Sequence, residues 1–190
     1  MGVWPSIAAL AVAMVALPTT AMAQNWHSAY TDLNLERCAI VQQAGLSTDF
    51  ACAGWDDFPV LVRHGEHRVF VSYGSDARDE MVWQQSVPSI NQTGETLEWL
   101  FADGQRPVAT ILRYFIDRSE IGGPDEQVLV VTKLERGNTC HLAYIDARQN
   151  TEANQMAREA ARDLVPGWDC ETMPAKSVGI GGVTGFSQAR

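Results

Sequence analysis

The chain has 190 residues and a formal net charge of −9, with 14 lysines and arginines against 23 aspartates and glutamates. A chain this acidic is not expected to bind nucleic acid or an anionic lipid surface through charge. The acidity does not by itself predict a basic partner, because surplus surface acid often serves solubility alone.

The amino-terminal residues 1–23 have the pattern of a secretory signal peptide. An apolar run, Ile7 to Leu17, precedes Ala21-Met22-Ala23, the small-x-small pattern after which signal peptidase cuts. The run is too short to span a membrane. Residues 1–6 contain no Lys or Arg, so only the amino terminus supplies the positive charge typical of this region. We expect a mature chain that starts at Gln24, has no membrane span, and is periplasmic or secreted.

Four cysteines lie in the mature part of the chain: Cys38, Cys52, Cys140 and Cys170. An exported chain meets an oxidising environment, so we expect two disulfides. Three pairings are open from the sequence, and we favour the pairing of neighbours, Cys38 with Cys52 and Cys140 with Cys170. Each bond would stabilise the fold by about 3 to 4 kcal/mol. A four-cysteine metal site is disfavoured because no C-x-x-C pair is present.

The mature length suits one globular domain, predicted over residues 24–173. Within it, residues 33–44 are ambiguous. A helix there would end at Gly45, whereas Leu33 and Leu35 alternate with polar neighbours as in a strand. We favour the helix. The segment 174–190 is rich in Gly, Ala and Ser and is predicted to be a flexible tail.

Three segments in the middle of the chain each show an apolar run, a turn signal and a second apolar run, which is typical of β-hairpins. The predicted hairpins join 59–63 to 68–73, 97–102 to 107–116, and 128–135 to 140–146. Gly65 suits a type II′ turn in the first, and Asp103-Gly104 is a strong turn signal in the second. Consecutive hairpins predict an antiparallel meander of about six strands. Segments 108–116 and 128–131 are nearly continuously apolar, so they should be central.

One amphipathic helix is predicted over residues 152–164. Its apolar positions recur at helical spacing; they are Ala153, Met156, Ala157, Ala160, Ala161 and Leu164. Thr151 suits the N-cap, and Pro166-Gly167 would end the helix. Packed against the sheet, this helix predicts an α+β fold.

Histidines provide the only pattern that suggests a metal. His64 and His67 flank Gly65-Glu66, and a two-residue turn there would place the two imidazoles opposite each other. A catalytic zinc needs a third protein ligand, and the spacing specifies none. We therefore predict no metal site or cofactor and keep His64 and His67 as candidates only. His141 alternates with Ala143 and Ile145, which predicts a histidine at the edge of the core rather than a base.

Five of the six tryptophans lie beyond the signal sequence. Trp99 alternates with Leu97 and Phe101 and should be buried. Trp55 and Trp83 lie in more polar surroundings and are the candidates for an exposed recognition surface, although buried packing is the more common fate of this side chain. No Gly-x-Ser-x-Gly motif or other nucleophile signature is present, so no catalytic residue is predicted.

Several short motifs resemble exported bacterial proteins of unknown function. They are Tyr30-Thr31-Asp32-Leu33, Cys52-Ala53-Gly54, Pro59-Val60-Leu61-Val62, Val71-Ser72-Tyr73-Gly74 and Cys140-His141-Leu142-Ala143-Tyr144-Ile145-Asp146. The resemblance implies export and no particular activity. We expect a non-enzymatic binding or inhibitor-like module with a protein or small-molecule partner in the cell envelope. The alternative is a cell-envelope hydrolase, metal-assisted through His64 and His67.

Overall fold

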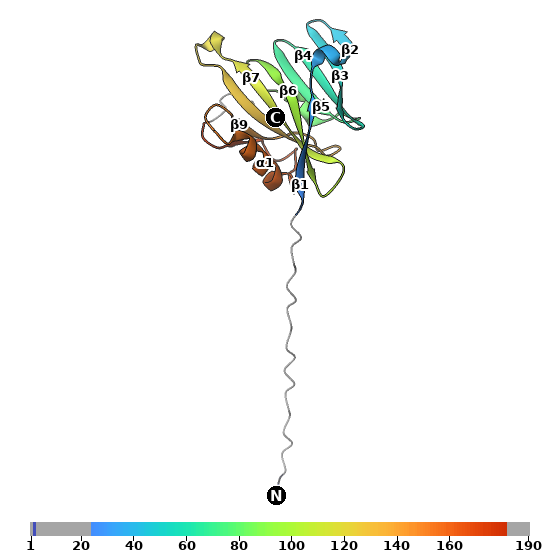
Figure 1. Ribbon diagram of the computed structural model, residues 1–190, viewed down its shortest axis with the longest axis vertical. Helices are drawn as coiled ribbons and strands as arrows, with labels where there is room; N and C mark the ends of the chain where they lie inside the picture. Colours follow the sequence, from blue (N-terminus) through green and yellow to red (C-terminus); the bar gives the residue numbers. More distant parts are fainter. Residues whose placement is uncertain (1, 3–23, 182–190) are drawn as a thin grey trace.

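Over residues 24–181 the fold is α+β, mostly sheet with one α-helix, as the sequence predicts (Figure 1). A computed structural model describes Gly2 and residues 24–181. The predicted signal peptide, residues 1–23, lies outside the described residues apart from Gly2. No helix among the described residues is long and apolar enough to cross a membrane.

The larger sheet has six strands and contains the predicted meander. In spatial order they are β1 (Trp26–Asp32), β6 (Ile90–Ala102), β7 (Pro107–Asp117), β8 (Glu126–Lys133), β9 (His141–Asp146) and β10 (Lys176–Val178). Strands β6 to β9 are joined by the second and third predicted hairpins, and the apolar β7 and β8 are central, as expected. β10 pairs parallel to β9, so the sheet is mixed. Residues 176–178 fall in the predicted tail but form this strand instead, whereas residues 182–190 lie outside the described residues.

A second, four-stranded antiparallel sheet was not predicted. Its strands follow the chain order and are β2 (Ala39–Ala44), β3 (Ser47–Trp55), β4 (Phe58–Gly65) and β5 (Arg68–Tyr73). The first predicted hairpin is β4–β5, and it therefore belongs to this sheet rather than to the meander. Its turn is Glu66-His67, with φ of 51° and 64° at the two residues, and not Gly65-Glu66.

The predicted helix over residues 33–44 is wrong. Only a short 3-10 helix, η1 (Leu35–Arg37), forms there, capped by the side chain of Asn34, which accepts a hydrogen bond of 2.9 Å from the Glu36 N–H. β2 follows as an edge strand whose backbone bonds to β3. The neighbouring strand β3 decides that this segment is a strand and not a helix, because β-branched residues such as Ile40 fit a strand when another strand is available for pairing.

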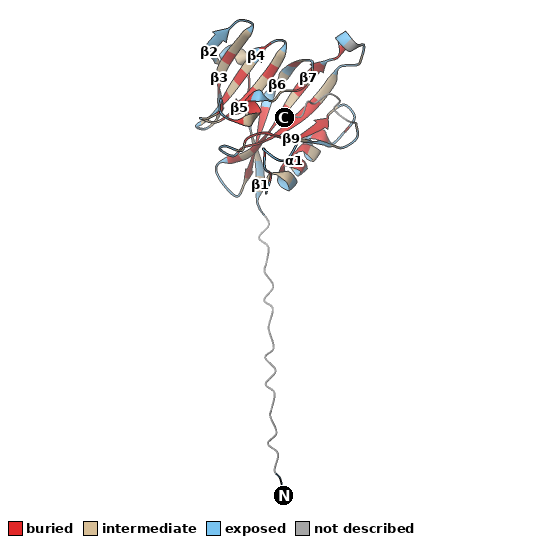
Figure 2. Ribbon diagram, turned by 180° about the vertical axis from the view of Figure 1, so that it is seen from behind, coloured by how far each residue is buried: buried red, intermediate tan, exposed pale blue. Residues whose placement is uncertain are grey.

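The two sheets and the helix form three layers. Neighbouring side chains along a strand point to opposite faces. On β7, Leu112 belongs to the core between the two sheets, while Ile111 belongs to the core between the larger sheet and α1 (Ala153–Leu164). Figure 2 shows that buried residues concentrate along the strands of the two sheets.

α1 matches the predicted helix and buries the alanines of its predicted stripe, whereas Met156 and Leu164 are half-buried. Ala153, Ala157, Ala160 and Ala161 are buried against β8 and β9. The N-cap residue is Glu152 rather than Thr151, and its side chain makes no capping hydrogen bond. Small side chains on this face bring the helix backbone close to the sheet, so the helix is held by tertiary packing more than by its cap.

Both disulfides form with the predicted pairing. Cys38–Cys52 joins the end of η1 to β3, and Cys140–Cys170 joins the start of β9 to the segment after α1. The first bond therefore links the chain that leaves the larger sheet to the smaller sheet. The second links the helix layer to the larger sheet.

Candidate functional site

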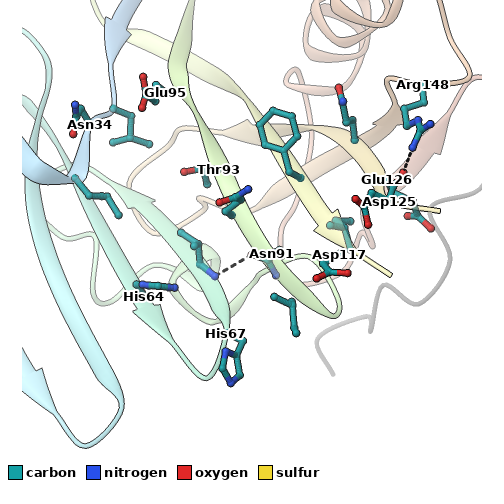
Figure 3. A pocket seen from close by; sticks show the side chains of 18 of the residues that line it. Asn34, His64, His67, Asn91, Thr93, Glu95, Asp117, Asp125, Glu126 and Arg148 are labelled. Carbon is teal, nitrogen blue, oxygen red and sulfur yellow. Dashed lines mark hydrogen bonds between the residues drawn. The ribbon is translucent and has the colours of Figure 1, made fainter. Parts of the chain in front are cut away.

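A groove of about 1060 Å³ is lined by residues of both sheets (Figure 3). Its walls come from the η1 segment 33–36, the first half of β6, and the adjoining ends of β7 and β8 at residues 115–117 and 125–127. The β4–β5 hairpin contributes Val69 and its tip. Pockets of several hundred cubic ångströms at element junctions are typical binding sites for small molecules.

Asn91 joins the two sheets beneath the groove. It is 5% exposed. Its backbone N–H donates to the His67 carbonyl at 2.9 Å, and its Oδ1 accepts from the Val69 N–H at 3.0 Å. Its Nδ2 donates to the Val87 carbonyl at 2.8 Å. A buried amide with all these partners fixes the position of β6 against the hairpin, so the groove is preformed rather than made by loose loops.

The floor of the groove rests on apolar residues, although polar surface prevails in the groove as a whole. Leu33, Val69 and Ile116 line this floor and belong to the core between the sheets. Leu33 is held in place by its N–H, which donates to the Glu95 carbonyl at 2.7 Å. Phe115 adds a half-buried aromatic ring.

Carboxylates stand on separate sides of this floor, as Figure 3 shows for Glu95 on one side and for Asp117, Asp125 and Glu126 on the other. Glu36 lines the same side as Glu95 because η1 and β6 adjoin there through the Leu33 hydrogen bond.

Only one of these carboxylates is paired with a buried cation. Arg118 donates to both oxygens of Glu126, at 3.0 and 3.1 Å. Hydrogen bonds from the side chain and backbone of Ser119 lower the pKa of Asp117, so this group carries its charge at neutral pH.

Positive charge in the groove is sparse by comparison. Arg148 is the only arginine or lysine among the lining residues, and its guanidinium donates to the backbone carbonyl of Asp125. No ion pair within residues 24–181 involves Glu36 or Glu95. The groove therefore presents a surplus of negative charge.

The structure brings His64 and His67 to the groove but does not place them opposite each other. His64 pairs with Val69 across the hairpin, and His67 occupies the turn itself. The predicted geometry is wrong because the turn lies one residue further along the chain than expected. Within residues 24–181, no three His, Cys, Asp or Glu side chains gather in a way that could hold a metal ion.

The two tryptophan candidates lie outside the groove. Trp83 on η2 (Met81–Gln84) is 3% exposed, which is the more common fate of this side chain, because Arg63 packs 4.1 Å from its ring centroid and the loop closes over β5. Trp55 is half-buried, with its ring edge against Phe101 at 5.4 Å between centroids. Trp99 is fully buried, as predicted.

His141 is buried, as expected from the alternation along its strand. It is 2% exposed, and its Nδ1 lies 2.9 Å from the Tyr144 hydroxyl. Burial away from water lowers the pKa of His141 to about 3. A histidine that stays neutral and inaccessible is a core residue, which excludes it from the site.

Sequence reasoning missed the carboxylates of the groove. They come from four separate segments of the chain, and each one read alone is an ordinary surface acid on a strand or a turn. No spacing signal could have joined them, since only the tertiary fold sets η1 beside the ends of β6, β7 and β8.

Compared with known proteins, the chain matches no family model, no curated protein and no solved structure.

Proposed function

We propose that the protein is an exported, non-enzymatic binding module of the cell envelope that holds its ligand in the groove between the two sheets. The observation that carries the proposal is the groove itself, a preformed concave site with an apolar floor and polar rims. Sites of this kind orient a ligand with few polar groups and bury most of it.

Rigid walls support a binding role. β6 and the β4–β5 hairpin are fastened to each other through Asn91, and the η1 wall is fastened to β3 through Cys38–Cys52. A site that is already ordered spends little conformational entropy when a ligand enters. The signal-like segment 1–23 and the two disulfides support export, because disulfides persist in oxidising compartments.

The test is to fill the groove and look for loss of a bound molecule. Thr93 lines the groove, whereas Thr96 lies further along β6 and does not. Wild type, Thr93→Trp and Thr96→Trp would be purified from the periplasm and incubated with periplasmic extract. Native mass spectrometry would then record the mass of each protein and of anything bound.

We expect a bound mass on wild type and Thr96→Trp that is missing from Thr93→Trp, on chains that begin at Gln24. A wild-type protein that carries nothing, or a bound mass that Thr93→Trp leaves in place, would refute the groove as the binding site. Stoichiometric zinc that disappears on His64→Ala would instead favour the metal-assisted hydrolase.

A further inference from the structure

The chemistry of the groove indicates its class of ligand, an inference that rests on the proposed function. We propose that the groove binds a linear aliphatic polyamine. Ammonium groups of the ligand contact carboxylates on the two sides of the groove, and the methylene chain between them lies over the apolar floor.

The floor offers apolar surface to an alkyl chain. Leu35, Ile90 and Phe115 line the groove and are each only half-buried, so part of their surface remains open to a ligand. Beneath them, Leu33 and Val69 belong to the core, and the side chain of Asn91 is already hydrogen-bonded to the backbone. Burying apolar surface away from water is favourable. This contribution favours a ligand with methylene groups over a bare ion.

The charges stand apart rather than in one cluster. Glu36 and Glu95 come from the η1–β6 side, while Asp117 and Asp125 come from the ends of β7 and β8. Figure 3 shows Glu95 on the opposite side of the groove from Asp117 and Asp125. A single metal ion needs its ligands within about 2 to 2.6 Å of one point, whereas separated carboxylates suit separate positive charges. Two or more ammonium groups joined by a chain meet that requirement.

The groove also lacks what an anionic ligand would need. Among the described residues that line it, Arg148 is the only arginine and already donates to a backbone carbonyl, and the other basic groups are His64 and His67, which are exposed at the hairpin. An anion would therefore face five carboxylates, of which Glu126 is paired with Arg118, whereas a cation would be attracted by the other four.

Titration calorimetry of the wild-type mature protein with spermidine tests the inference. Parallel titrations use putrescine, ethylenediamine, Mg²⁺ and the tripeptide trilysine. We expect one spermidine per chain, affinity that increases from ethylenediamine to putrescine as methylenes are added, and Mg²⁺ at least about tenfold weaker than putrescine, although both carry two charges. Raising the salt concentration should weaken the binding of spermidine without abolishing it.

Paired variants separate the groove from the general acidity of the chain. Glu95→Gln combined with Asp117→Asn removes one carboxylate from each side of the groove and should lower the affinity for spermidine at least about tenfold. Glu159→Gln combined with Glu171→Gln removes the same charge from exposed positions outside the groove, and affinity should stay within about twofold.

Each contrary result has a clear meaning. If the two double variants lose the same affinity for spermidine, or if Mg²⁺ binds as tightly as putrescine, the inference is overturned in favour of general charge attraction. Trilysine that binds more tightly than spermidine would overturn it in favour of a lysine-bearing peptide. If spermidine does not bind while the native protein carries a different molecule that Thr93→Trp excludes, the polyamine inference fails and the proposed function stands.

Discussion

Buried His141 should make the protein less stable as the pH falls below neutrality. Its pKa falls from 6.5 to about 3 on burial, so the imidazole is neutral in the folded state at pH 5, where the unfolded chain has already bound a proton. The unfolded state binds more protons across this window, and stability therefore decreases as the pH decreases. Full stability is present above the unfolded pKa and is lost between that value and the folded pKa.

The size of the effect follows from the shift. One pKa unit corresponds to about 1.4 kcal/mol. A pH of 5 is about 1.5 units below the pKa of His141 in the unfolded chain. This one residue therefore lowers the free energy of unfolding by about 2 kcal/mol relative to pH 7.5. Carboxylates with lowered pKa, such as Asp169, contribute to the loss only at lower pH.

Urea unfolding of wild type and His141→Gln at pH 7.5, 6.5, 5.5 and 5 measures the effect. The glutamine keeps a polar group near the Tyr144 hydroxyl but does not titrate, so the variant should lose about 2 kcal/mol less than wild type between pH 7.5 and 5. The other ionisable groups are common to both proteins and cancel in this comparison. Parallel pH profiles for the two proteins would refute the reasoning, whatever the cost of the substitution at pH 7.5.

Three further substitutions test the packing of the layers by urea or thermal unfolding. Ala157→Asp places an unpaired carboxylate on the fully buried face of α1 and should cost about 3 kcal/mol or more; a cost under about 1 kcal/mol would contradict the packing. Arg158→Ala removes the guanidinium that binds Glu98 at 2.6 Å and should lower the stability by about 2 kcal/mol. Adding Glu98→Gln should restore part of that stability, because the carboxylate left without its partner is removed. No recovery of stability would show that the charge of Glu98 is not the cause. Replacing Cys140 and Cys170 by serine opens a loop of 30 residues and should cost about 4 kcal/mol, so an unchanged melting temperature would refute the stabilising role of this bond.

Local patterns predicted the elements that depend on local chemistry. The second and third hairpins form where Asp103-Gly104 and Gly137 interrupt apolar runs, and α1 spans the predicted stripe to within one residue. Neighbouring cysteines pair, as their short separations favour. In each of these cases the signal and the structure it specifies lie within about 30 residues of each other.

Prediction failed where a distant partner decides between two local options. Residues 39–44 have no helical preference strong enough to prevent pairing with β3, and they form a strand of the smaller sheet. The polar stretch around Trp83 left both exposure and burial open, and Arg63 from β4 decides for burial by packing over the ring. The turn of the first hairpin lies one residue later in the chain than predicted, so His64 and His67 do not face each other.

Periodicity and turn chemistry along the chain were enough to predict the class of fold, the meander and the helix, and the spacing of the cysteines favoured the pairing that forms. The division of the strands into two sheets, and the groove where they meet, depend on contacts between residues that are distant in the sequence. Its carboxylates at Glu36, Glu95, Asp117 and Asp125 are far apart in the sequence and acquire a common role only through the packing of η1, β6, β7 and β8. Cooperation between such residues is a property of three-dimensional distance, which no local pattern encodes.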